Sequence, residues 1–157
     1  MTLKCYLTVG CLASGKTKIA KEIATKEHLI YLNPDEFWDR KSIKEYSPPI
    51  WINAWSEVYK RVYQAIKNEQ SFIIDSIQKN HVVRKEIINV IRSIAHNQCE
   101  IIGMWVKTDL DKCIERNKIR EDSVPEEEII KVYNIIQQEP PSLEEDGYDR
   151  IIEVENN

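Results

Sequence analysis

The stretch Gly10-Cys11-Leu12-Ala13-Ser14-Gly15-Lys16-Thr17 matches the pattern G-x-x-x-x-G-K-[ST] at every fixed position. An apolar run over residues 3–9 precedes it, as expected of a buried strand. A helical pattern follows, whose apolar face is formed by Ile19, Ala20, Ile23 and Ala24. A strand, a glycine-rich turn and a helix in this order are the setting of a phosphate-binding loop, or P-loop. The sequence therefore predicts a P-loop at residues 10–17.

Each fixed position of this loop has a physical task. The glycines allow a tight turn that points backbone N–H groups at phosphate oxygens, and the helix that follows adds its positive end. Lys16 is expected to bridge the β- and γ-phosphates of ATP, and the Thr17 hydroxyl to bind Mg²⁺. The predicted nucleotide-binding residues are Gly10, Cys11, Ala13, Ser14, Gly15, Lys16 and Thr17.

Strand and helix patterns alternate along the rest of the chain. Further strands are expected at residues 28–32, 71–75, 99–106 and 150–154, and helices at 50–68, 82–96, 110–120 and 125–138. This alternation predicts an α/β fold in which a five-stranded parallel sheet carries helices on both faces. No repeat or linker divides the chain, so residues 1–157 are expected to form one P-loop domain.

The composition limits the class of protein and its location in the cell, but it does not identify the binding partner. Hydrophobic residues make up 42% and charged residues 31%, as in soluble globular proteins. No apolar run is long enough to span a bilayer and no signal peptide is evident, so a cytoplasmic location is expected. The four cysteines are scattered, which favours reduced thiols over a zinc site or a disulfide framework. The net charge is −4, but residues 139–157 carry −6 and the rest +2, so a local basic groove is compatible with the sequence.

Two carboxylates follow predicted strands, at the edge where open parallel sheets bind ligands. Asp75 ends the third strand and is predicted either to help hold Mg²⁺ or to organise the acceptor site, although it could also cap a turn. Asp35 lies in Asn33-Pro34-Asp35-Glu36, where Asn33 and Glu36 resemble a helix-capping pair. The alternative role of Asp35 is that of a general base for the acceptor hydroxyl, worth about 10²–10⁴ in rate. Spacing alone leaves both roles open.

A basic segment, Arg116-Asn117-Lys118-Ile119-Arg120, ends the helix predicted at 110–120. Arg116 and Arg120 are four residues apart and would share one helix face, which is often only a solvated stripe. In kinases with a P-loop, arginines between the fourth strand and the last helix belong to a lid that stabilises the transferring phosphoryl group. The segment is therefore a candidate for a short lid of the adenylate-kinase type, with residues 121–125 as its turn.

Taken together, these motifs resemble the kinase module of the phage-type polynucleotide 5′-hydroxyl kinases. The likeness rests on four stretches in the same order, which are Leu7 to Thr17, Asn33 to Phe37, Ile73 to Ser76 with Asn80, and Arg116 to Pro125. The resemblance implies that Lys16 and Thr17 serve ATP and Mg²⁺. It also implies that Asp35 is the general base, Asp75 an acceptor-site organiser, Arg120 the phosphoryl clamp and Arg116 a second arginine of the catalytic group.

The sequence departs from that family at three places. Leu12-Ala13 stands where the family has Pro-Gly, and Pro34 stands where it has an arginine before the base. Trp38 replaces the arginine that contacts the acceptor's 3′-phosphate in the family, and the nearest substitute is Arg40. Trp38 and Arg40 are accordingly predicted to contact the acceptor, but the change leaves the nucleic-acid substrate open. The chain ends after the kinase module, so no appended phosphatase domain is expected.

Aromatic residues are concentrated between residues 37 and 63. Trp51, Trp55, Tyr59 and Tyr63 recur every four residues and so form a stripe on one predicted helix. Such a stripe usually packs in a core, but it could also serve as a platform on which bases stack. Charges that could follow a nucleic-acid backbone are supplied nearby by Lys41, Lys44, Lys60 and Arg61.

The sequence thus predicts an ATP- and Mg²⁺-dependent kinase that phosphorylates a 5′-hydroxyl end of DNA or RNA in nucleic-acid repair. A kinase for a small hydroxyl compound, such as a nucleoside, a sugar or an antibiotic, is the alternative. A nucleotide-binding module without phosphotransfer is a third possibility, against which the two carboxylates and the lid arginines weigh. The choice between DNA and RNA, the preferred nucleoside triphosphate and the oligomeric state are open.

Overall fold

The structure, a computed structural model, describes residues 2–37 and 48–157. Five parallel strands form one sheet in the order β2-β3-β1-β4-β5. The strands are β1 (Leu3–Val9), β2 (Ile30–Leu32), β3 (Phe72–Ile74), β4 (Cys99–Lys107) and β5 (Arg150–Glu155). The predicted α/β fold is confirmed, and β3, which ends just before Asp75, pairs directly with β1.

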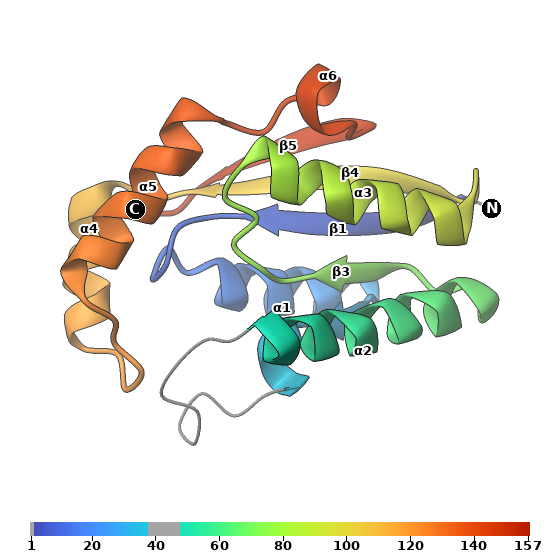
Figure 1. The fold of residues 1–157 in the computed structure, drawn as a ribbon, viewed down its shortest axis with the longest axis horizontal. Helices are drawn as coiled ribbons and strands as arrows, with labels where there is room; N and C mark the ends of the chain where they lie inside the picture. Colours follow the sequence, from blue (N-terminus) through green and yellow to red (C-terminus); the bar gives the residue numbers. More distant parts are fainter. Residues whose placement is uncertain (1, 38–47) are drawn as a thin grey trace.

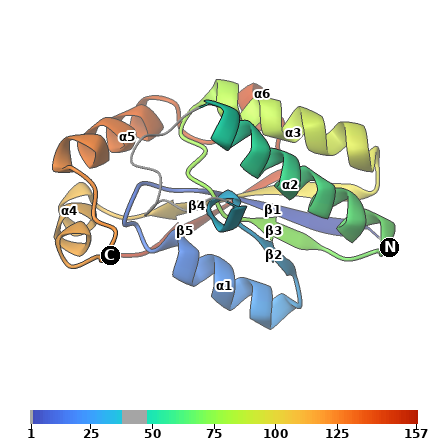
Figure 2. The same cartoon turned by 60° about the horizontal axis from the view of Figure 1, so that its bottom comes forward.

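Helices cover both faces of this sheet because side chains alternate along each strand. Leu3, Cys5 and Leu7 of β1 join one core cluster, which packs under α2 (Pro48–Lys67) and α3 (His81–Ala95). Tyr6 of the same strand faces the other way and packs in a second cluster with Ala20 of α1 (Lys16–Glu27). Figure 2 shows α1 on one side of the sheet and α2 with α3 on the other.

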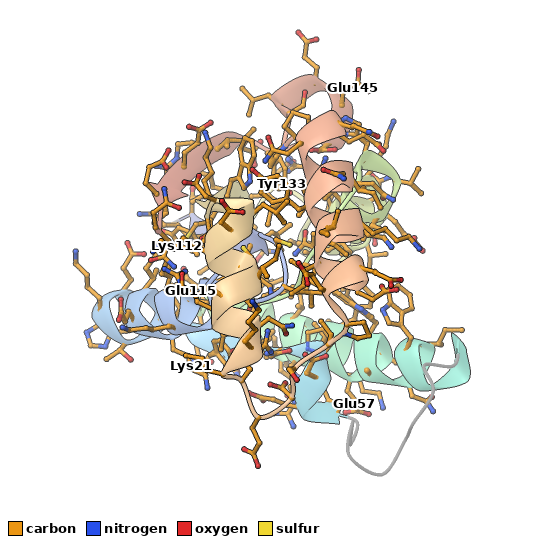
Figure 3. All side chains as sticks on the ribbon, turned by 90° about the vertical axis from the view of Figure 1, so that its left-hand side faces the viewer. Lys21, Glu57, Lys112, Glu115, Tyr133 and Glu145 are labelled. Carbon is orange, nitrogen blue, oxygen red and sulfur yellow. The ribbon has the colours of Figure 1, made fainter. Side chains whose placement is uncertain are left out.

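A third cluster closes the end of the sheet at which β1 finishes. Val9 and Cys11 pack there against Cys113 of α4 (Leu110–Lys118) and Ile129 of α5 (Glu126–Gln138). Figure 1 shows α4 and α5 together at this end of the sheet, where the loop between β1 and α1 also lies. In the end-on view of Figure 3, Tyr133 of α5, which is partly buried and packs against this cluster, lies between the two helices. All elements needed for a site at the carboxyl ends of the strands therefore converge here.

Most element boundaries differ from those predicted by one or two residues, and three differences bear on the site or the fold. His28, at a φ of 57°, ends α1 in the left-handed conformation, so β2 begins at Ile30 rather than at residue 28. The helix α4 ends at Lys118, two residues before Arg120. A one-turn helix, α6 (Leu143–Asp146), was not predicted, and it begins where the Ser142 side chain accepts a hydrogen bond from Glu145 N at 3.2 Å.

The aromatic stripe on α2 is largely core. Trp55 is buried, and Trp51 and Tyr59 pack against the same cluster with ring centroids 5.8 and 5.5 Å from that of Trp55. Tyr63 alone of the four is exposed. The packing interpretation is therefore correct for three members of the stripe. Trp38 and Arg40, like Lys41 and Lys44, lie outside the described residues.

None of the helices in the described part of the chain has the length and apolarity that crossing a membrane requires. The four cysteines are buried free thiols.

Candidate nucleotide and acceptor site

The loop between β1 and α1 requires both of its glycines. A Cβ atom on Gly10 would lie 2.9 Å from Ser14 Oγ and 3.3 Å from the Val106 carbonyl oxygen. Gly15 has a φ of 86°, and a Cβ there would lie 2.3 Å from Asn156 Nδ2. Ala13 also has a positive φ, 61°, a conformation that glycine adopts more readily than alanine. Left-handed residues within such a turn direct successive N–H groups into one concave nest, which is the geometry that binds phosphate.

The carbonyl group of Ser14 fixes the orientation of this loop. Its oxygen accepts hydrogen bonds from Asn156 Nδ2 at 2.7 Å, Thr108 Oγ1 at 2.8 Å and Arg116 Nη1 at 3.1 Å. In a trans peptide the N–H of the next residue points away from the carbonyl. Anchoring the Ser14 carbonyl on the outside of the loop therefore holds the Gly15 N–H toward the inside, where a phosphate would bind.

Lys16 begins α1 and connects the loop to the predicted catalytic residues. Burial lowers the pKa of Lys16 below its ordinary value, and the nearby carboxylates Asp75 and Asp35 oppose this effect. Arg120 adds to the lowering because it brings a second positive charge to the same place. The side chains predicted from three separate parts of the sequence thus act on one lysine. The structure brings Lys16, Asp35, Asp75 and Arg120 into one electrostatic environment.

Asp75 is held between the two strands that end beside it. Its carboxylate accepts a hydrogen bond from Tyr31 Oη at 2.6 Å, and Asn33 Nδ2 lies 3.4 Å from the same oxygen. The backbone N–H of Asp75 bonds to the Leu32 carbonyl at 2.8 Å. Only 2% of Asp75 is exposed, and its second oxygen, Oδ1, has no hydrogen-bond partner among the described residues. Burial, followed by the bond to Asp75, raises the pKa of Tyr31, which therefore stays a hydrogen-bond donor.

Asp35 lies in the 3-10 helix η1 (Pro34–Phe37), directly after β2. Asn33 caps this helix as predicted, because its Oδ1 accepts the Asp35 N–H at 2.9 Å, and its carbonyl accepts the Glu36 N–H at 3.0 Å. The cap uses the backbone of Asp35, whereas its exposed carboxylate contributes to the field at Lys16. The two roles proposed for this segment are therefore compatible, since different atoms carry them.

The two lid arginines have different surroundings. Arg116 donates to the Ser14 carbonyl and so supports the outside of the P-loop. Arg120 lies beyond the end of α4 and pairs with Asp122 through bonds of 3.3 and 3.2 Å. The prediction that both share one helix face is wrong, because α4 ends at Lys118. Arg120 is the arginine whose charge is felt at Lys16.

Asn117 explains why the helix ends where it does. Its side-chain amide donates to the Val124 carbonyl at 2.7 Å, and its Oδ1 accepts the Val124 N–H at 3.0 Å. This pair of bonds closes the turn between α4 and α5 and leaves Arg120 within it. The Asn117 amide therefore stabilises a turn where the helix could have continued, and this turn is the base of the predicted lid.

Several residues of the site were not predicted. Asn156 and Thr108, which hold the Ser14 carbonyl, lie 142 and 94 residues away from it in sequence. Tyr31 gives no signal beyond that of an aromatic residue in a strand. Asn117 stands inside the quoted lid segment, but a single asparagine late in a helix pattern does not indicate its partner. Only the topology, which places β4 and β5 beside β1, brings these groups to the loop.

The residues present fit a nucleotide with a divalent cation. Ala13 and Gly15 have the positive φ angles that a phosphate-binding nest uses. Thr17 stands exposed at the start of α1, and Asp75 Oδ1 is a buried carboxylate oxygen that has no partner among the described residues. Among the described residues, no group of three or more His, Cys, Asp or Glu side chains could hold a metal by itself. Such a sparse set suits Mg²⁺, which keeps several waters and takes further oxygens from substrate phosphates.

Residues 6–134, more than half of the chain, match the family model described as AAA domain. The chain belongs to this family. The matched range includes the P-loop, both carboxylates and the lid segment. No curated protein matches the chain.

Solved structures share the fold at low sequence identity. A gluconokinase from Sinorhizobium meliloti 1021 matches with a TM-score of 0.65 at 11% identity, over 98% of this chain and 82% of that one. A sugar kinase from Janibacter sp. HTCC2649 matches with a TM-score of 0.66 at 17% identity, over 99% and 86%. A chain of the Pnkp1/Rnl/Hen1 RNA repair complex matches with a TM-score of 0.74 at 19% identity, over 87% of this chain and 45% of that one. The fold of this AAA-domain protein is thus that of P-loop kinases.

Proposed function

We propose that this protein transfers the γ-phosphoryl group of ATP to a 5′-hydroxyl end of DNA or RNA. The observation that carries the proposal is the electrostatic environment of Lys16 at the P-loop, where burial lowers the pKa of the lysine and the charges of Asp75, Asp35 and Arg120 act on it. A nucleotide switch needs the lysine and one carboxylate for its metal. A second carboxylate, Asp35, and an arginine in a lid turn are what a phosphotransferase adds.

The roles follow from these positions. The acceptor hydroxyl gives its proton to the Asp35 carboxylate while its oxygen attacks the γ-phosphorus, and the bond to the β–γ bridging oxygen breaks. ADP leaves, and the phosphoryl group ends on the acceptor. Lys16 and Arg120 stabilise the charge on the transferring group. Mg²⁺, held through Thr17 and Asp75, would supply further neutralisation of the β- and γ-phosphate oxygens when bound.

Three features support a polynucleotide acceptor. The four-motif resemblance to polynucleotide 5′-hydroxyl kinases includes Asp35, Asp75 and Arg120, which the structure brings near Lys16. The chain also shares its fold with a component of an RNA repair complex. In addition, Arg61 lies over the Phe37 ring, with Cζ 5.0 Å from the ring centroid, so a positive charge stands beside η1.

A kinase for a small hydroxyl compound is the second candidate. It is favoured by Trp38, which stands where the polynucleotide kinases carry an acceptor-binding arginine, and by the net charge of −4. The gluconokinase and the sugar kinase share the fold over nearly the whole chain. Both candidates use the same catalytic residues, and they differ only in what binds beside Asp35.

Transfer of labelled γ-phosphate separates these candidates. The purified protein with ATP and Mg²⁺ is given a short 5′-hydroxyl oligonucleotide, and in parallel nucleosides, gluconate and other sugars. Labelling of the oligonucleotide alone supports the proposal. Labelling of a small compound with none on the oligonucleotide replaces it with the second candidate. ATP binding without transfer to any acceptor would mean that the protein is a nucleotide-binding module and that both candidates are wrong.

The different surroundings of the two arginines give a prediction. Arg120→Ala is expected to lower turnover by about 10³-fold or more, because it removes charge from the transferring group. Arg116→Ala is expected mainly to weaken ATP binding, by about tenfold, because it removes one of three donors from the Ser14 carbonyl. Titration with a non-hydrolysable ATP analogue, combined with single-turnover kinetics, distinguishes the two effects. Equal losses of turnover in both variants would mean that the arginines act as one group.

A further inference from the structure

Buried polar atoms without a partner are concentrated at one place in this fold. Within the described residues they are Ser14 Oγ, Asp75 Oδ1, Ser76 Oγ, Gln78 Nε2, Gln78 Oε1 and Tyr148 Oη. All but the tyrosine hydroxyl belong to the P-loop or to the segment that follows β3, residues 75–78. Buried polar groups are nearly always paired, so a local cluster of exceptions marks a place where a ligand completes the pairing.

The backbone of segment 75–78 is held firmly while its side chains remain unpaired. Thr8 Oγ1 donates to the Ser76 carbonyl at 2.8 Å and accepts the Ser76 N–H at 2.9 Å. The Gly10 N–H bonds to the Ile77 carbonyl at 3.3 Å, and the buried Arg84 donates to the Gln78 carbonyl at 3.0 Å. Because the main chain is fixed from three directions, the positions of these side chains are preorganised.

Gln78 is the member of the segment that is hardest to explain by packing. It is 3% exposed, and neither end of its side-chain amide has a hydrogen bond. Its φ of 51° lies in the left-handed region, where glycine or asparagine would be less strained. An apolar side chain of the same length would avoid burying an unpaired amide. Two separate features therefore make glutamine unfavourable here for stability, which indicates a function for its amide.

The segment contacts the first residue of the P-loop, Gly10, which lies near the Lys16 side chain. Gly10, whose N–H bonds to Ile77, is close enough to the lysine that a Cβ on Gly10 would lie 3.3 Å from Lys16 Cδ. Figure 1 shows the connection from β3 to α3 at the same end of the sheet as the P-loop. Arg116 and Asn156 hold the outside of the loop through Ser14. Gln78 lies three residues after Asp75, whose carboxylate accepts hydrogen bonds from Tyr31 and Asn33. The Asn33 side chain also accepts the backbone N–H of Asp35.

We infer that the side-chain amide of Gln78 binds the phosphoryl acceptor beside its reacting hydroxyl and so helps to determine which acceptor is used. The inference rests on the proposed function, which supplies the acceptor. An amide presents one acceptor oxygen and two donor hydrogens. It therefore suits a group that offers both, such as the sugar and phosphate of a terminal nucleotide. Gln78 is a specificity residue in this scheme, and proton transfer is left to Asp35.

The test compares Gln78→Met with the wild type in two measurements. In thermal unfolding without ligand, the variant is expected to melt about 2–4 °C higher, because it buries no unpaired amide. In steady-state transfer to a 5′-hydroxyl oligonucleotide, the KM for the oligonucleotide is expected to rise about tenfold or more, with the KM for ATP within about twofold. Gln78→Asn, which keeps an amide and tolerates the positive φ, is expected to recover part of the loss.

Gln70→Met is the matched control, because Gln70 is an exposed glutamine before β3 and should tolerate the change. An unchanged KM for the oligonucleotide in Gln78→Met would overturn the inference while leaving the proposed function intact. A fall in melting temperature together with a rise in both KM values would also overturn it, because the amide would then be structural. If the wild type binds ATP but labels no oligonucleotide, the proposed function fails and this inference fails with it.

Discussion

Asp35→Asn is expected to lower turnover by about 10²–10⁴ while leaving ATP binding within about twofold of the wild type. The carboxamide cannot take the proton of the acceptor hydroxyl. The fold of η1 should survive, because the Asn33 side chain bonds to the backbone N–H of Asp35 and this group is unchanged. Single-turnover transfer and titration with a non-hydrolysable ATP analogue measure the two quantities separately.

Glu36→Gln is the control for this variant. Glu36 is the next residue in the same 3-10 helix and is also exposed, so both substitutions remove one negative charge from one turn. A loss confined to Asp35→Asn assigns the base. A wild-type rate in Asp35→Asn would mean that Asp35 is not the general base and only forms part of the capped helix η1. Equal losses in both variants would mean that the negative charge of η1 matters, and not proton transfer to Asp35.

The parts of the site that lie close together in sequence could be predicted from it. The P-loop is one continuous stretch whose fixed residues are set by the geometry of a phosphate, so the pattern alone locates Lys16 and Thr17. Asp75 could be placed because a polar residue that ends an apolar strand must lie at the carboxyl edge of a parallel sheet. The pairing of β3 with β1 then brings it to Lys16.

The parts that depend on distant contacts could not be predicted. Nothing near Asn156 indicates that its amide will bind the Ser14 carbonyl, because that contact exists only once β5 has packed beside β4. The end of α4 was misplaced for a similar reason. Helical periodicity continues through Arg120, but the chain turns after Lys118, and two bonds between Asn117 and Val124 close this turn. Periodicity cannot detect a side chain that competes with the backbone.

Lys16→Met is expected to lower kcat/KM for phosphoryl transfer by about 10³-fold or more with any acceptor, because it removes the positive charge beside the transferring phosphate. The same variant should be at least as stable as the wild type without nucleotide. Burial lowers the pKa of Lys16 despite Asp75 and Asp35, so the charged ammonium disfavours the folded state. Kinetics with two acceptors and thermal unfolding at pH 7 test the two halves of this prediction.

The pH dependence of that stability difference follows from the same shift. The pKa of Lys16 is lower in the folded state than its ordinary value of 10.5, so unfolding takes up a proton between the two values. The wild type therefore gains stability as pH rises through this window, and Lys16→Met lacks the gain. The variant's advantage in melting temperature should shrink between pH 7 and about pH 10, and Lys18→Met, at the exposed next lysine of α1, is the matched control for the loss of a lysine from this helix. A pH-independent difference would mean that Lys16 is solvated in the free protein. The preorganised, partly desolvated ammonium that this site offers to phosphate would then not exist before the nucleotide binds.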